Sequence, residues 1–240
     1  MDLLGNEELK NTAKRKQTED DEKENLEPSS RKQPTLRNCI NSLLHDHNID
    51  KLCLYVEPKL KELIKKGNLY DDRELVIKVI FHALLLDIPN HFVDTEVPIN
   101  VYEVKRNNNF LYADLLIVEI KSTENSKRNR FIFEFKNKGV NFLDLQIKGN
   151  NSSWEVMERK AYKVEAMSRR DVLQLKCNNL EKFNHGKTMR EIFNGAREQL
   201  LNYVRNLKKD DHQNNFEFIT SAFVVMAVGS RKLIWEKISC

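Results

Sequence analysis

The sequence predicts an α/β domain whose mixed central β-sheet is flanked by helices. Helical segments, a group of three strands, further helices and two final strands follow one another in that order. The helices show apolar residues at three- and four-residue spacing, whereas the strands are apolar runs that end in polar or glycine-containing turns. No segment of roughly 20–50 residues is repeated, which excludes a repeat architecture.

The expected elements can be placed along the chain. Helices are expected over residues 36–48, 57–66, 71–86, 153–183 and 188–207. Strands are expected over residues 97–104, 110–120, 130–136, 216–228 and 233–238. Polar turns at residues 105–109 and 121–127 would join the first three strands, and residues 229–232 the last two. Thr188 is the predicted N-cap of the fifth helix.

Composition limits the class of protein. The chain has 240 residues, of which 40% are hydrophobic and 32% are charged, as is typical of a globular protein. Its longest apolar runs fall far short of the ~20 residues that a membrane span needs, and the acidic first ten residues do not resemble a secretory signal. The 4 cysteines form no CxxC pair, so no disulfide framework or structural zinc site is expected. An intracellular protein, cytoplasmic or nuclear and without a membrane partner, is predicted.

Two regions differ in their charge pattern. Residues 1–36 contain 7 basic and 9 acidic side chains and few large apolar ones, which predicts a disordered N-terminal tail before a domain at 37–240. Residues 121–190 contain 16 basic and 8 acidic side chains. A positive excess of this kind suits an anionic partner such as the phosphate backbone of a nucleic acid, although it also serves solubility.

A pair of acidic residues lies in the central strands. If the turn between the second and third strands is centred on Glu124, Asp114 and Glu134 lie opposite each other, with Cβ atoms roughly 5 Å apart. Two carboxylates at that separation repel each other unless a cation lies between them, and oxygen ligands suit Mg²⁺ or Mn²⁺. Lys136 shares a strand face with Glu134, and its ammonium can orient an attacking water beside such an ion.

These residues resemble the PD-(D/E)XK nuclease superfamily, in particular its RecB-like and AAA-ATPase-associated families. The pattern here is Ala113-Asp114, nineteen intervening residues, then Glu134-Phe135-Lys136. The resemblance implies a restriction-endonuclease-like core, metal binding by Asp114 and Glu134, water positioning by Lys136, and the Phe135 carbonyl as a further ligand. Ala113 stands where the signature often has Pro or Gly.

Two more motifs extend the resemblance. Glu74 is similar to the upstream helical glutamate of RecB-like members, which would assist a second ion or the general base. Gln199 and Tyr203 are similar to their Q-xxx-Y helix and would contact substrate. The stretch between Gly139 and that helix is longer than expected, so we interpret residues 140–187 as a basic helical insertion.

The predicted function is a Mg²⁺- or Mn²⁺-dependent nuclease that hydrolyses phosphodiester bonds, with DNA favoured over RNA. The alternative is a catalytically silent nuclease fold that binds nucleic acid or a protein, because fold alone never establishes activity. A plain interaction domain, in which the aligned acids are coincidental, is the third interpretation. A homodimer or another protein partner is compatible with the sequence but is not required by any motif.

Overall fold

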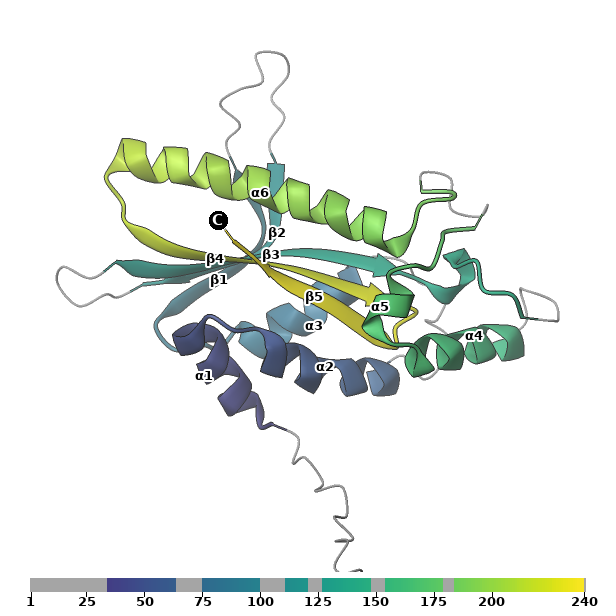
Figure 1. Ribbon diagram of the computed structural model, residues 1–240. Helices are drawn as coiled ribbons and strands as arrows, with labels where there is room; N and C mark the ends of the chain where they lie inside the picture. The colour runs from purple at the N-terminus through teal and green to yellow at the C-terminus, as the bar shows by residue number, and fades with distance from the viewer. Residues whose placement is uncertain are drawn as a thin grey trace, which may run out of the picture. The chain divides into compact units, whose positions relative to one another are not determined.

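A computed structural model describes residues 34–63, 75–99, 111–120, 127–147, 154–178 and 184–239 (Figure 1). The N-terminal tail predicted over residues 1–36 falls almost entirely outside these residues, as do the predicted turn at 105–109 and Glu74. The described elements are α1 (Leu36–Asp46), α2 (Asp50–Leu63), α3 (Leu75–Leu85), β1 (His91–Ile99), β2 (Leu111–Glu119), β3 (Arg128–Lys138), the short 3₁₀ helix η2 (Val140–Phe142), α4 (Trp154–Ala166), α5 (Arg169–Val172), α6 (Met189–Asn214), β4 (Phe218–Val228) and β5 (Lys232–Ile238).

The five strands form one mixed sheet in the order β1-β2-β3-β4-β5, which confirms the predicted α/β class with a mixed sheet. β1, β2 and β3 are antiparallel neighbours, β4 is parallel to β3, and β5 is antiparallel to β4. The parallel pair requires a crossover, which α6 supplies. α6 begins with a capping box in which Thr188 and Glu191 satisfy each other's backbone N–H groups, so the predicted N-cap is confirmed.

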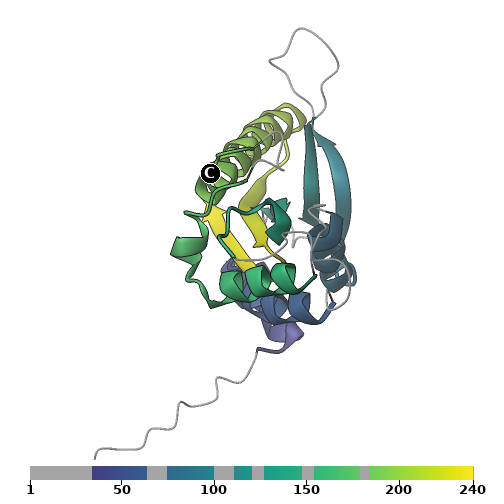
Figure 2. The ribbon, with the colours of Figure 1, turned by 90° about the vertical axis from the view of Figure 1, so that its right-hand side faces the viewer.

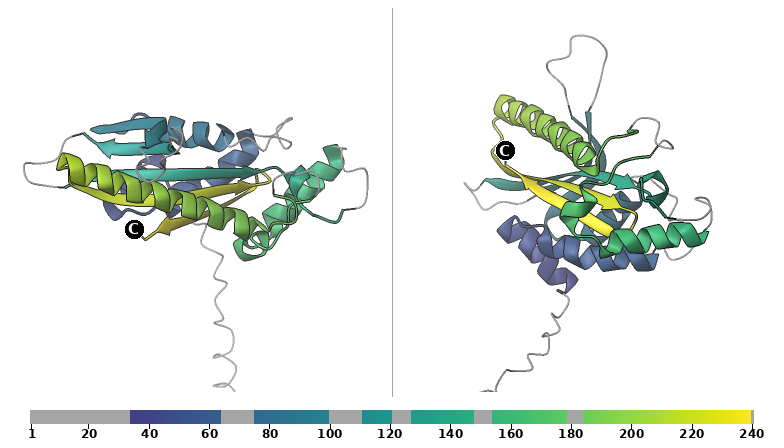
Figure 3. Two further views of the ribbon diagram at one scale, coloured as in Figure 1. Left: turned by 90° about the horizontal axis from the view of Figure 1, so that it is seen from above. Right: turned by 45° about the vertical axis from the view of Figure 1, so that its right-hand side comes forward.

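Helices cover both faces of the sheet. α6 lies along one face, and α1, α2 and α3 lie along the other, as Figures 1 and 2 show. Figure 3 shows from above that α6 lies alongside β3 and β4 and runs in the opposite direction. We call the apolar layer under α6 the α6-side core; it includes Ile132, Val224 and Leu200. The opposite layer, the α3-side core, includes Phe81, Phe133 and Phe135.

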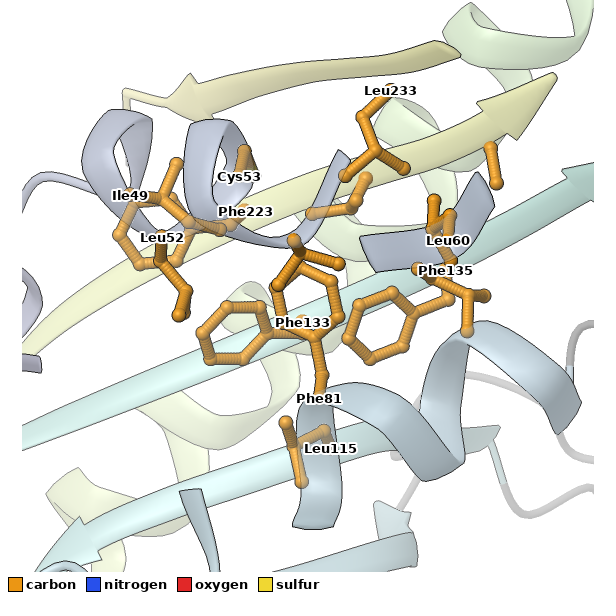
Figure 4. Close-up of a cluster of buried hydrophobic side chains, with 14 of the residues drawn as sticks. Ile49, Leu52, Cys53, Leu60, Phe81, Leu115, Phe133, Phe135, Phe223 and Leu233 are labelled. Atoms are coloured by element: carbon orange, nitrogen blue, oxygen red, sulfur yellow. The ribbon is translucent and has the colours of Figure 1, made fainter. Parts of the chain in front are cut away.

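The alternation of β3 separates these two cores. Phe131, Phe133 and Phe135 point into the α3-side core, where the Phe133 ring lies 5.2 Å from the ring of Phe223 and 5.9 Å from that of Phe135 (Figure 4). The intervening even-numbered positions face α6, and Glu134 is one of them. The aromatic packing on one face of β3 therefore fixes the direction of the polar side chains on the other.

Two predicted elements have different bounds. α2 begins at Asp50 and not at 57, and it passes through Pro58, because the buried side chains of Leu52, Val56 and Leu60 form one continuous helical stripe. The first strand runs from His91 to Ile99, whereas the sequence predicted 97–104. β1 is an edge strand, so Pro98 within it removes no hydrogen bond that the sheet needs.

Other differences from the prediction concern the segment between β3 and α6 and the end of α6 itself. Residues 153–183 were predicted to be mostly helical, but α4 and the short α5 are the only helices in the described part of that segment. α6 runs to Asn214, one and a half to two turns past the predicted end at 207. Within the described ranges, no helix is long and apolar enough to cross a membrane.

The aromatic layer predicts a large stability effect. Phe133 is fully buried, so Phe133→Ala leaves a cavity and should lower the free energy of unfolding by about 3–5 kcal/mol. Urea unfolding followed by circular dichroism measures the change. Phe92, with 53% of its surface exposed, provides the matched control, and Phe92→Ala should cost less than about 1 kcal/mol. Equal losses in the two variants would contradict this account of the core.

Candidate functional site

Asp114 and Glu134 lie at the end of the ladder between β2 and β3. The paired positions run from Val118 and Arg130 to Leu115 and Phe133, so Asp114 and Glu134 are the next positions in the same register. This is the register that a turn centred on Glu124 predicts. Asp114 Oδ2 accepts the backbone N–H of Phe135 at 2.7 Å. The side chain of Asp114 thus bonds β3 just beyond the paired residues Leu115 and Phe133.

Both carboxylates are removed from water. Asp114 is 6% exposed and Glu134 is 0% exposed. A buried carboxylate without a compensating charge is costly, so cations are needed nearby. Lys136 Nζ lies 2.8 Å from Glu134 Oε1, and Lys78 Nζ lies 2.6 Å from Asp114 Oδ1. Each carboxylate therefore has an ammonium of its own.

Lys136 occupies its predicted position. It lies two residues after Glu134 on β3, so both side chains share the face toward α6. Its side chain is 20% exposed, whereas that of Glu134 is fully buried. The Lys136 side chain therefore extends from the buried carboxylate to a more exposed part of the cluster.

Lys78 was not singled out from the sequence. It is the one charged residue of α3, whose other side chains are apolar except for His82. Lys78 Nζ also contacts Glu96 Oε1 at 2.5 Å. Burial by itself lowers the pKa of Lys78, but hydrogen bonds and charges from Asp114 and Glu96 outweigh it and leave the pKa raised. A lone lysine in an apolar helix signals a buried charged partner, and this signal could have identified it.

Glu96 lies opposite Asp114 on β1. The pairs on either side are Thr95 with Leu115 and Val97 with Ala113. Glu96 has a backbone φ of 55°, which residues other than glycine rarely adopt. The side chain of Glu96 is 59% exposed, so Lys78 bridges one buried and one exposed carboxylate.

α6 brings Gln199 and Tyr203 to the cluster. Gln199 Nε2 donates to Tyr203 Oη across one turn of the helix. The pKa of Tyr203 is raised to about 12, chiefly by burial and also by the charges of Glu134 and Asp114, while Gln199 and Lys136 act in the opposite direction. Tyr203 therefore lies within electrostatic reach of all three residues of the predicted triad.

A further ion pair, between Arg130 and Asp211, anchors α6 over this cluster. Arg130 donates to Asp211 through both terminal nitrogens, at 2.9 and 2.6 Å, and is 4% exposed. Glu134 lies four residues along β3 from Arg130, about 13 Å in a strand. Tyr203 lies eight residues back along α6 from Asp211, about 12 Å in a helix. The similar distances explain why Tyr203 arrives beside Glu134.

The remaining predicted positions have different outcomes. Glu74 lies outside the described residues. The ring of Phe135 is buried in the α3-side core, and its backbone N–H is held by Asp114. Part of the basic segment at 121–190 is committed to the fold, because Arg130 binds Asp211 and Arg169 stacks on Trp235 with its guanidinium 3.6 Å from the ring centroid.

The donor set suits a magnesium-like ion. In the described part of the chain, no three His, Cys, Asp or Glu side chains form a metal-binding group. Mg²⁺, however, is commonly held by one or two carboxylates and completed by waters and substrate phosphate. Asp114 and Glu134 supply two carboxylates, and Asp114 Oδ1 already holds a cationic group, the Lys78 ammonium. These residues fit such an ion, provided that Lys78 moves.

No match is found when the chain is compared with protein-family models, with curated proteins or with solved structures. The resemblance to the PD-(D/E)XK superfamily therefore rests on the sequence motifs alone and stays a prediction. Asp114, Glu134 and Lys136 lie together on β2 and β3, and Tyr203 approaches them from α6. These contacts are the basis for a functional proposal.

The raised pKa of Tyr203 predicts a stability change at high pH. The pKa rises from 10.0 to about 12 on folding, so the unfolded chain loses the phenolic proton first. The stabilisation is therefore complete below about pH 10 and is lost as the pH rises through about 12. Between these values the wild type should lose up to about 2 kcal/mol more unfolding free energy than Tyr203→Phe.

Urea unfolding at a series of pH values measures this difference. Tyr162, whose ring is 56% exposed, provides the control, and Tyr162→Phe should follow the wild-type pH dependence. Parallel curves for the wild type and Tyr203→Phe would contradict the burial of Tyr203 near the two carboxylates, because burial is the largest cause of its raised pKa.

Proposed function

We propose that this protein is a metal-dependent nuclease that hydrolyses phosphodiester bonds, with DNA as the favoured substrate. The observation that carries the proposal is the buried pair of Asp114 and Glu134 at adjoining positions of β2 and β3, with Lys136 bound to Glu134. Oxygen ligands of this kind, beside an ammonium, are the parts that such a hydrolysis needs.

The arrangement of elements supports the proposal. A helix, three antiparallel strands, a crossover helix and a strand parallel to β3 succeed one another along the chain. This order is compatible with the restriction-endonuclease-like core that the resemblance implies. The motif residues also lie at adjoining positions of the central strands, where the flanking cores hold them rigidly.

Each residue of the cluster has a distinct proposed role. Asp114, Glu134 and the Phe135 carbonyl would hold Mg²⁺ or Mn²⁺, which when bound polarises a phosphate oxygen and acidifies a water. Lys136 would orient the attacking water and balance negative charge that develops on the phosphate. Tyr203, held by Gln199, would position the substrate on the α6 side. Burial of the cluster strengthens all of these charge interactions.

One observation favours a catalytically silent module as the second candidate. Lys78 and Lys136 already neutralise the two carboxylates, at 2.6 and 2.8 Å. The protein's own side chains thus supply one positive charge beside each carboxylate. A module of this kind would bind nucleic acid or a protein without turnover, and activity measurements separate the two candidates.

The nuclease proposal predicts cleavage that depends on the carboxylates. Purified full-length protein should cleave linear, circular or single-stranded DNA in Mg²⁺ or Mn²⁺, and EDTA should abolish cleavage. Asp114→Asn, Glu134→Gln and Lys136→Met should each lower the rate by at least about 100-fold. RNA substrates of matched length test the preference for DNA.

Lys51→Met provides the matched control for the lysine variant, because Lys51 is exposed on α2 and lies outside the basic segment at residues 121–190. It should cleave at the wild-type rate. Cleavage at the wild-type rate by all three site variants would contradict the nuclease mechanism. Salt-sensitive binding of nucleic acid without cleavage, unchanged by Glu134→Gln, would support the silent module instead.

A further inference from the structure

Lys78 holds the carboxylate that the proposed metal ion needs. Its ammonium lies 2.6 Å from Asp114 Oδ1, while Asp114 Oδ2 accepts the N–H of Phe135 at 2.7 Å. Both oxygens of Asp114 are therefore engaged. A metal ion that binds Asp114 must displace the Lys78 ammonium or lie directly beside it, and two cations repel each other strongly at such distances.

The same ammonium has a second acceptor within reach. Lys78 Nζ lies 2.5 Å from Glu96 Oε1, and the side chain of Glu96 is 59% exposed against 8% for that of Asp114. An ammonium that leaves Asp114 can thus remain paired with Glu96 and gain contact with water. Such a move is small, because both acceptors are already in contact with the same nitrogen.

We propose that Lys78 is an internal counter-cation that competes with the divalent ion for Asp114 and is retained by Glu96 when the ion binds. This inference rests on the proposed metal site, and it assigns Lys78 and Glu96 a role in metal affinity. Glu96 belongs to the exchange because it lies opposite Asp114 on β1. Lys78 is here a positioning residue and not a catalytic one.

A purely structural role makes the opposite prediction. If Lys78 only neutralised a buried carboxylate, its removal would disturb Asp114 and leave metal binding unchanged or weaker. If Lys78 competes with the ion, its removal frees the carboxylate and tightens metal binding. The direction of the change in dissociation constant therefore distinguishes the two roles.

Isothermal titration with Mn²⁺ of the full-length protein tests the inference. Lys78→Met keeps the length of the side chain and should bind Mn²⁺ at least about tenfold more tightly than the wild type. Glu96→Gln removes the second acceptor and should weaken binding several-fold. In the Lys78→Met background, Glu96→Gln should lose most of this effect, because the competing ammonium is absent.

Lys51→Met is the control, and its dissociation constant should equal that of the wild type. Circular dichroism and urea unfolding establish that each variant is folded. If Lys78→Met does not fold, Lys78→Gln is measured in its place, and Glu96→Gln in the wild-type background remains an independent test. Folded Lys78 variants that bind Mn²⁺ no more tightly, or a Glu96→Gln effect that is equal in both backgrounds, would overturn the inference.

Failure of the nuclease proposal gives a different result. The protein could bind Mn²⁺ through Asp114, as shown by loss of binding in Asp114→Asn, and yet cleave no nucleic acid. This result would refute the nuclease activity, and the dissociation constants of the Lys78 and Glu96 variants would still decide the exchange. Cleavage by the wild type together with an unchanged dissociation constant in Lys78→Met would refute only the exchange. No Mn²⁺ binding by the wild type or by Lys78→Met would refute both.

Discussion

The burial of two carboxylates at the end of the β2–β3 ladder is the constraint on which the candidate site depends. Asp114 replaces a backbone partner for the N–H of Phe135, and this contact holds its carboxylate beside Glu134. Because both groups are almost fully buried, the protein must place positive charge next to them. Lys78 from α3 and Lys136 from β3 meet that requirement from two different elements.

The two cores hold this charged cluster in a fixed geometry. The phenylalanine side chains of β3 pack against α3, so the polar side chains between them must point toward α6. On that side, the ion pair between Arg130 and Asp211 anchors α6 to β3 and brings Tyr203 to the carboxylates. The cluster therefore depends on packing across the whole sheet, and a change in either core would be felt at the site.

Local patterns predicted much of this arrangement. Alternation in β3 and the equal arms of the turn around Glu124 gave the register of Asp114 and Glu134, and the N-cap at Thr188 located the helix that carries Tyr203. The predicted start of α2 was wrong because proline is common in the first turn of a helix, so Pro58 indicated a start near residue 57. The predicted start of β1 was wrong because proline usually interrupts a strand, whereas this edge strand contains Pro98. The lone charge of α3 signals that Lys78 has a charged partner, but local pattern could not identify Glu96 and Asp114, since they lie 18 and 36 positions away in the sequence.

The position of a bound ion tests the central claim most directly. A crystal structure of the full-length protein with Mn²⁺, with the ion located by its anomalous scattering, measures that position. Our account predicts an ion coordinated by Asp114 and Glu134, with Lys78 no longer on Asp114 and still paired with Glu96. A Mn²⁺ ion bound elsewhere, or none at the carboxylates while Lys78 remains on Asp114, would contradict it.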